Sequence, residues 1–259
     1  MATIVKNKRV QWVFFDIGDV VANEDKLRFN IYKILESSLR EHAIDLTFQD
    51  IIACREDLIL GHADESPHYT IAKMYLDKKA YDQWHDSIRT YIHKHLTRDL
   101  ILVPGMDKVL KKLSKTYSIG IIADQPHEIM QFLKKNGIDH CFKIFAISGL
   151  LNMNKPRKKI FEWAVNHAGC SFGQAVMIGD RIDRDIFPAK QLDMMTIQAR
   201  WNTYRKGFIP KNKKQELYLA SLDRIKNWQI EPNSRSETAD AIVEKVSDIP
   251  AVIQKLGPA

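Results

Sequence analysis

The sequence predicts an α/β fold, an open doubly wound parallel sheet with an inserted helical module. Three observations predict it. From about residue 100 onward, apolar segments of strand length alternate with amphipathic helical stretches. One further apolar segment, residues 10–15, lies near the N-terminus and ends in Asp16. The intervening residues 23–99 show helical periodicity and contain no strand candidate.

The candidate strands after residue 100 are separated by helical stretches. They comprise residues 117–122, 142–148, 175–178 and 194–199. Strands spaced in this way with helices between them form βαβ units, whose parallel sheet is covered on both faces. In such a sheet, reactive groups are expected at the carboxyl ends of the strands.

Prolines and glycines set the limits of two core helices. The stretch 126–137 begins with Pro126 and stops at Gly137, and the stretch 156–169 repeats this arrangement. The other helical stretches expected in the core are residues 103–115, residues 184–193 and, after a last short strand, the end of the segment 239–256.

The helical module is expected to be separate from the sheet. Its clearest amphipathic stretches are residues 26–44 and 66–96. The predicted division is a first core part at 1–22, a helical cap at 23–99 and a second core part at 100–259.

Composition restricts the class of protein. The 259 residues, 45% of them hydrophobic, suffice for one core with an insertion. The longest apolar stretches have strand length and the N-terminus lacks a secretory signal, so we expect no membrane span. The three cysteines are few and not spaced as zinc ligands, which favours the cytoplasm.

The net charge of +7 raises the question of nucleic acid. Basic residues gather at 154–159 and 204–214, but neither aromatic-interleaved basic motifs nor zinc-finger spacing accompany them. Attraction of a small anionic substrate is therefore favoured over nucleic-acid binding.

Chemistry-bearing side chains occur where a doubly wound sheet places its sites. They are Asp16 after the first strand, Asp124 after the second, Lys155 before a helix, and Asp180 after a later strand, followed by Asp183 and Asp185. An oxygen-rich set of this kind suits Mg²⁺, and a carboxylate such as Asp16 can act as a nucleophile toward phosphorus.

In this order and at these spacings, the motifs resemble the haloacid dehalogenase-like (HAD) hydrolase superfamily, whose members are mostly phosphatases. The resemblance covers nearly the whole chain and implies a Rossmann-like core with a helical cap. It implies that Asp16 forms an aspartyl-phosphate and that Lys155 neutralises both the nucleophile and the phosphoryl group.

The resemblance also implies a Mg²⁺ site. Asp16, Asp180 and the Gly18 carbonyl would hold the ion. Asp185, or Asp183 in its place, would hold a metal-bound water or Lys155 in position. Asp124 would bind substrate together with Lys155. Mg²⁺ is needed because a carboxylate nucleophile and a phosphate monoester repel each other.

Two positions depart from the family's pattern. Relatives carry a second aspartate two residues after the nucleophile as general acid and base, where this chain has Gly18. Asp19 is one residue too far along and is expected to point elsewhere. Ala123 stands where a hydroxyl usually binds a phosphoryl oxygen. Candidate substitutes for the acid are Asp124, His127, Asp19 or a group from the cap.

These features predict a Mg²⁺-dependent phosphatase that acts on a small phosphorylated metabolite. The alternative is a catalytically weak or inactive protein of the same fold that binds a phosphometabolite or a protein partner, as Gly18 and Ala123 would suggest. Dehalogenation is disfavoured, because dehalogenases use no metal and have no need of the acidic loop at 179–185.

Overall fold

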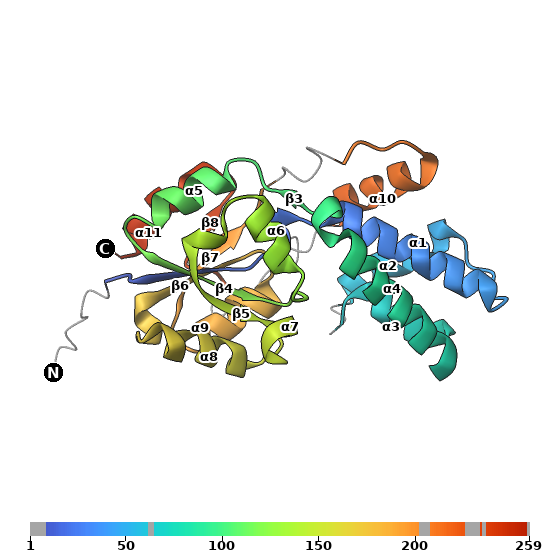
Figure 1. The fold of residues 1–259 in the computed structure, drawn as a ribbon, viewed down its shortest axis with the longest axis horizontal. Coiled ribbons are helices and arrows are strands. Elements are labelled where there is room, and N and C mark those ends of the chain that lie inside the picture. Colours follow the sequence, from blue (N-terminus) through green and yellow to red (C-terminus); the bar gives the residue numbers. More distant parts are fainter. Residues whose placement is uncertain (1–8, 62–64, 202–207, 226–233, 235–236, 258–259) are drawn as a thin grey trace. The chain divides into compact units, whose positions relative to one another are not determined.

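The computed structural model describes residues 9–61, 65–201, 208–225, 234 and 237–257, which form two compact units (Figure 1). The α/β unit comprises the described residues of Met1–Asn23, Ile101–Tyr204 and Glu231–Ala259, and the helical unit comprises those of Glu24–Leu100 and Arg205–Ile230.

The α/β unit is built on a six-stranded sheet in the order β5-β4-β1-β6-β7-β8. Its strands are β1 (Trp12–Phe15), β4 (Ser118–Ala123), β5 (Phe142–Ile147), β6 (Ala175–Gly179), β7 (Met195–Ala199) and β8 (Ala241–Val243). All five pairings are parallel, so the carboxyl ends of the strands share one edge. The predicted doubly wound α/β class is confirmed.

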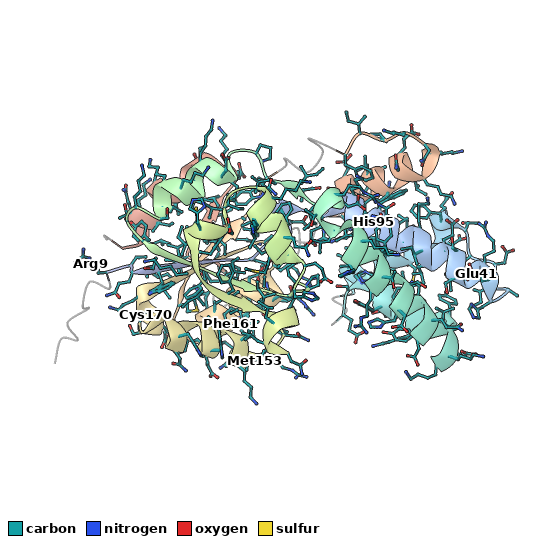
Figure 2. All side chains as sticks on the ribbon, in the orientation of Figure 1. Arg9, Glu41, His95, Met153, Phe161 and Cys170 are labelled. Atoms are coloured by element: carbon teal, nitrogen blue, oxygen red, sulfur yellow. The ribbon has the colours of Figure 1, made fainter. Side chains whose placement is uncertain are left out.

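Helices cover both faces of this sheet (Figure 1). One face carries α5 (Met106–Leu113), α6 (Ile129–Lys135) and α11 (Ile249–Leu256), and the other carries α8 (Lys158–Ala168) and α9 (Phe187–Lys190). The short α7 (Ser148–Leu151) follows β5 directly. Phe161 of α8 lies in the core on its side of the sheet (Figure 2), in one cluster with Phe14 of β1.

A second, two-stranded sheet lies where the chain leaves the α/β unit and returns to it. It pairs β2 (Ala22–Asn23) with β3 (Ile101–Leu102) in the antiparallel sense. Strands of two residues are too short to produce an alternating pattern, which explains why the sequence did not predict them.

The described part of the helical unit contains helices and no strand. These are α1 (Asp25–Glu41), α2 (Phe48–Leu60), α3 (Pro67–Tyr75), α4 (Lys78–Asp99) and α10 (Lys213–Arg224). None of the helices in the described part of the chain is both long enough and apolar enough to cross a membrane.

Helix α10 differs from the predicted division, which placed all residues from 100 to 259 in the core. In the structure it belongs to the helical unit. The Tyr218 ring of α10 lies 5.8 Å from that of Phe29 and 6.0 Å from that of Tyr32. The Arg55 Nη1 of α2 donates to Ser221 Oγ at 2.9 Å. These contacts join residues 166 to 189 positions apart, a separation that local periodicity does not reveal.

Candidate functional site

Three carboxylates meet at the carboxyl edge of the parallel sheet. Asp16 follows β1, Asp180 follows β6, and Asp185 lies on a π-helical turn, Ile182–Ile186, just beyond it. Their exposed fractions are 8%, 4% and 0%. One carboxylate oxygen from each lies within 4.8 Å of the others. The adjacency of β1 and β6 in the sheet therefore brings together residues that are more than 160 positions apart in the sequence.

Lys155 lies between two of these carboxylates. Its Nζ is 2.7 Å from Asp16 Oδ1 and 2.5 Å from Asp185 Oδ1, and the side chain is buried. Burial alone would lower the pKa of Lys155, but the charges of Asp16 and Asp185 outweigh it and raise that pKa. Lys155 is therefore a charged ammonium fixed against the predicted nucleophile.

Asp124 holds the backbone of Lys155 in place. Asp124 Oδ1 accepts from the backbone N–H of Lys155 at 2.9 Å, and Oδ2 accepts from Arg184 Nη1 at 2.9 Å. The sequence predicted Asp124 as a substrate-binding residue and as a candidate acid. In the structure both of its oxygens are engaged, one with the backbone of Lys155 and one with Arg184. Sequence reasoning missed Arg184. The only signal for this residue was its position in the charge-rich loop 181–185.

Asp185 is held on the chain segment that also carries Asp180. Its Oδ2 accepts from the backbone N–H of Arg181 at 3.0 Å. A Cβ at Gly179 would lie 2.3 Å from the Asp185 side chain, so only glycine fits there. π-Helical turns of this kind occur frequently at functional sites.

Asp183 lies outside the carboxylate cluster. Its side chain is 48% exposed and accepts from Arg181 Nε at 2.9 Å. The sequence left Asp183 open as a substitute for Asp185. The structure brings Asp185, and not Asp183, to Lys155.

The turn after Asp16 contains the glycine that replaces the usual second aspartate. Gly18 is buried, forms a β-bridge with Ala22 and does not have positive φ. Asp19 instead adopts a left-handed conformation with φ 55°, and its N–H donates to the Ala22 carbonyl at 2.7 Å. The Trp201 indole, which the sequence did not single out, donates to the Asp19 carbonyl at 2.9 Å. Trp201 follows the carboxyl end of β7, so this hydrogen bond connects the turn after Asp16 to that end of β7.

The other candidate acids are placed differently. The side chain of His127 is 62% exposed and lies 3.3 Å from Glu128. Asp19 was expected to point away, yet its charge contributes to raising the pKa of Asp180. Ala123 is fully buried at the end of β4 and offers no hydroxyl.

The electrostatics of the cluster are unbalanced. Burial raises the pKa of Asp16 to about 7, with Lys155 opposing and Asp185 reinforcing the shift. Burial and then the charge of Asp185 raise the pKa of Asp180 well above its usual range. Three carboxylates face one ammonium, which leaves about two negative charges unmatched when all are ionised.

This donor set fits Mg²⁺. The ion prefers carboxylate oxygens with water completing its shell, and a divalent charge matches the excess negative charge. Asp16 and Asp180 are the two carboxylates that would hold it, because Asp185 is already engaged with Lys155 and Arg181. Gln198 Nε2 of β7 donates to the Asp180 carbonyl at 3.1 Å and so fixes that ligand's backbone.

Comparisons with known proteins agree with this geometry. The family model described as haloacid dehalogenase-like hydrolase matches residues 13–199. The glyceraldehyde 3-phosphate phosphatase of Pyrococcus furiosus is 26% identical over 208 residues, covering 76% of this chain and 83% of that protein. The pyrimidine 5′-nucleotidase YjjG of Escherichia coli is 24% identical over 213 residues, covering 77% and 91%.

Solved structures share the fold. A HAD phosphatase from Thermococcus onnurineus has a TM-score of 0.62 and 21% identity, covering 94% of this chain and 98% of that one. The HAD hydrolase YfnB from Bacillus subtilis, solved bound to magnesium, has a TM-score of 0.61 and 14% identity, covering 95% and 99%.

Proposed function

The chain belongs to the haloacid dehalogenase-like hydrolase family, and from this premise we propose that it is a Mg²⁺-dependent phosphatase that acts on a small phosphorylated metabolite. The observation that carries the proposal is the buried cluster of Asp16, Asp180 and Asp185 around Lys155. Such a cluster combines a nucleophile, a divalent-cation site and a fixed positive charge for a phosphoryl oxygen.

Asp16 is the nucleophile of the proposed reaction. One of its carboxylate oxygens forms a bond to phosphorus while the bond from phosphorus to the alcohol oxygen breaks. Water then attacks phosphorus, releasing inorganic phosphate and restoring the carboxylate. Lys155 holds Asp16 in one orientation at 2.7 Å and remains charged throughout, which stabilises the negative charge of the transferring group.

Asp16, Asp180 and the carbonyl of Gly18 would hold Mg²⁺, which would offset the repulsion between the nucleophile and the phosphate. Asp185 keeps Lys155 between the two carboxylates through its own contact at 2.5 Å. Asp124 and Arg184 fix the backbone from which Lys155 projects. The chain's own residues thus orient the reacting groups before the substrate arrives.

The site lacks a side chain at the position of the usual general acid, residue 18. The leaving alcohol oxygen therefore takes its proton from water or from a less well placed group. General acid–base catalysis is typically worth ~10²–10⁴-fold. We infer a phosphatase that is slow on alkyl phosphates and faster on esters with good leaving groups.

The names of the relatives suggest the first substrates to test. They are glyceraldehyde 3-phosphate and pyrimidine 5′-nucleotides, after the proteins from Pyrococcus furiosus and Escherichia coli. The net charge of +7 is in keeping with an anionic metabolite.

The decisive experiment measures phosphate release from a panel of phosphate esters with Mg²⁺ and with EDTA. Asp16→Asn should abolish turnover, a loss on the order of 10⁴-fold or more for removal of a nucleophile. Asp183→Asn is the matched control, because this carboxylate lies on the same acidic loop as Asp185 but pairs with Arg181 outside the cluster. It should retain nearly full activity. Turnover that survives Asp16→Asn, or that does not depend on Mg²⁺, would contradict the proposal.

Gly18 and Ala123 favour a second candidate, a protein that binds a phosphometabolite or a partner without hydrolysis. Beryllium fluoride distinguishes the two, because it mimics a phosphoryl group on an aspartate only where nucleophile, cation and lysine are competent. A Mg²⁺-dependent beryllium fluoride complex in the wild type, absent from Asp16→Asn, supports the enzyme. No complex and no turnover on any ester would favour the binding protein.

A further inference from the structure

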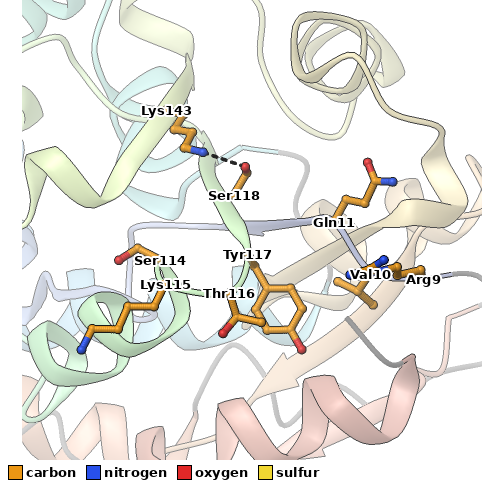
Figure 3. A pocket seen from close by; sticks show the side chains of 9 residues that line it. All are labelled: Arg9, Val10, Gln11, Ser114, Lys115, Thr116, Tyr117, Ser118 and Lys143. Atoms are coloured by element: carbon orange, nitrogen blue, oxygen red, sulfur yellow. Dashed lines mark hydrogen bonds between the residues drawn. The ribbon is translucent and has the colours of Figure 1, made fainter.

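A hollow lies at the edge of the sheet opposite the carboxylate cluster. It has a volume of about 380 Å³ and lies between the start of β1, the turn from α5 into β4, and the start of β5 (Figure 3). Ser118 of β4 is paired with Trp12, and β1 runs four residues from there to Asp16. At about 3.3 Å per residue, the hollow is roughly 13 Å from the nucleophile.

Three cations surround this hollow. They are Arg9, Lys115 and Lys143, all exposed. None of the described lining residues is Asp or Glu, and within the described part of the chain none of these cations forms an ion pair with a carboxylate. By contrast Lys190, elsewhere in the same unit, pairs with Asp240 at 2.6 Å. Three like charges around one concavity repel each other, and an anion in the hollow would relieve that repulsion.

Two uncharged residues of the same hollow, Tyr117 and Ser118, face opposite ways. Tyr117 is 5% exposed, and its hydroxyl has no hydrogen-bond partner in the described structure. In Figure 3 its side chain points away from Lys143 and Ser118, so this enclosed hydroxyl is not in reach of a ligand held by Lys143. Lys143 Nζ donates to Ser118 Oγ at 3.0 Å, and this hydrogen bond holds the Lys143 ammonium at the side of the hollow.

We propose that this hollow is a second, non-catalytic binding site for a small phosphorylated metabolite. Arg9, Lys115 and Lys143 would contact its phosphate oxygens. The volume lies in the range of sites for small ligands. The backbone N–H groups of residues 114–118 are all used within the fold, so recognition falls to side chains. The site is independent of the proposed hydrolysis, because none of its residues touches the carboxylate cluster.

Calorimetric titration of the full chain with inorganic pyrophosphate in EDTA tests the site. Without metal the unbalanced carboxylates repel the anion from the catalytic edge, so binding reports on the hollow. The double variant Lys115→Ala and Lys143→Ala should weaken pyrophosphate binding about tenfold or more. The matched control, Lys111→Ala and Lys112→Ala, removes two neighbouring exposed charges of α5 that do not line the hollow, and should change affinity less than twofold.

Tyr117→Phe is a further control that leaves the charge unchanged. It should change pyrophosphate affinity less than twofold, because the hydroxyl it removes is enclosed and points away from Lys143. Equal losses in the two lysine double variants would show attraction by net charge alone and overturn the proposal. Absence of pyrophosphate binding, including the case in which a single-stranded oligonucleotide binds instead, would overturn it as well.

Discussion

Each unit of the protein contains a conspicuous buried acidic site, Asp99 in the helical unit and the cluster around Asp16 in the α/β unit, and the two sites have opposite electrostatics. In the helical unit, Asp99 is fully buried and is contacted by Lys26 Nζ at 2.9 Å, Arg98 Nε at 2.9 Å, the Tyr91 hydroxyl at 2.5 Å and Asn30 Nδ2 at 3.1 Å. Burial would raise the pKa of Asp99, but these partners outweigh it and lower that pKa.

In the α/β unit, Asp16 shares one ammonium with Asp185 and lies near Asp180. Burial raises the pKa of Asp16 to about 7. Asp99 thus receives all its compensating charge from the chain, whereas the Asp16 cluster is compensated only in part. A buried carboxylate that only supports the fold is expected to resemble Asp99. Negative charge that the chain does not neutralise at the end of a strand indicates a functional site, and an added cation would supply the missing positive charge.

Lys155→Met should give the largest effect on stability. It removes the ammonium that lies between Asp16 and Asp185, and loss of one partner from a buried ion pair costs about 3 kcal/mol or more. The matched change Lys26→Met removes a side chain that is 34% exposed and leaves Arg98 on Asp99, so it should cost about 1 kcal/mol or less. Chemical denaturation at pH 8 in EDTA measures both. Equal losses would mean that the two clusters do not differ as described.

Gly18→Asp adds a carboxylate to the unbalanced cluster at the position of the missing acid. Because Gly18 does not have positive φ, aspartate fits the backbone there. Turnover on alkyl phosphates should rise on the order of 10²-fold, with little change on aryl phosphates, while the metal-free melting temperature falls. Gly18→Asn is the control, since it has the same shape without the acid. A gain in Gly18→Asn, or none in Gly18→Asp, would mean that another group already protonates the leaving oxygen.

Removing a charge should have opposite signs in the two clusters. In EDTA at pH 8, Asp180→Asn should stabilise the protein by about 1 kcal/mol, because it relieves repulsion from Asp185 and Asp16. Asp99→Asn should destabilise it by about 2 kcal/mol, because it weakens several charged hydrogen bonds. Only Asp180→Asn should abolish the rise in melting temperature caused by Mg²⁺. A destabilised Asp180→Asn variant would show that the cluster is balanced without a cation.

The sheet and the carboxylate cluster at its carboxyl edge were predictable because their signals are local. Apolar runs that end in Asp16 and Asp180 mark strand ends, and the parallel order places those ends together. The choice between Asp183 and Asp185 was not predictable. It depends on a π-helical turn and on the close approach of Asp185 to Gly179, neither of which has a periodic signature.

Long-range contacts account for the other omissions. The bond from Arg184 to Asp124 spans 60 positions and that from Trp201 to Asp19 spans 182. The assignment of α10 to the helical unit depends on aromatic and polar contacts to α1 and α2. A single sequence shows which residues are present, but it does not show which distant residues they contact.

The pH dependence of stability and of metal binding should also differ between the two clusters, and this effect should be smaller than those of the substitutions above. The pKa of Asp16 rises from 3.8 to about 7 on folding, so the folded chain keeps a proton that the unfolded chain has lost. The metal-free protein should therefore lose stability as pH rises from about 4 to about 7. Asp99 acts in the opposite sense, since its lowered pKa gives stability that is present above the ordinary carboxyl pKa and lost in acid.

Mg²⁺ must displace the proton from Asp16, so its affinity should rise about tenfold between pH 6 and pH 8, the ratio expected for a group of pKa about 7. Calorimetric titration at both pH values measures this. In EDTA, thermal unfolding of Asp16→Asn should show a smaller decline between pH 4 and 7, to which the raised pKa of Asp180 also contributes, and should keep the acid limb. Asp99→Asn should flatten the acid limb and keep that decline. A Mg²⁺ affinity independent of pH would mean that Asp16 is already ionised at pH 6, so that Lys155 and its surroundings compensate it as fully as Asp99 is compensated in the helical unit.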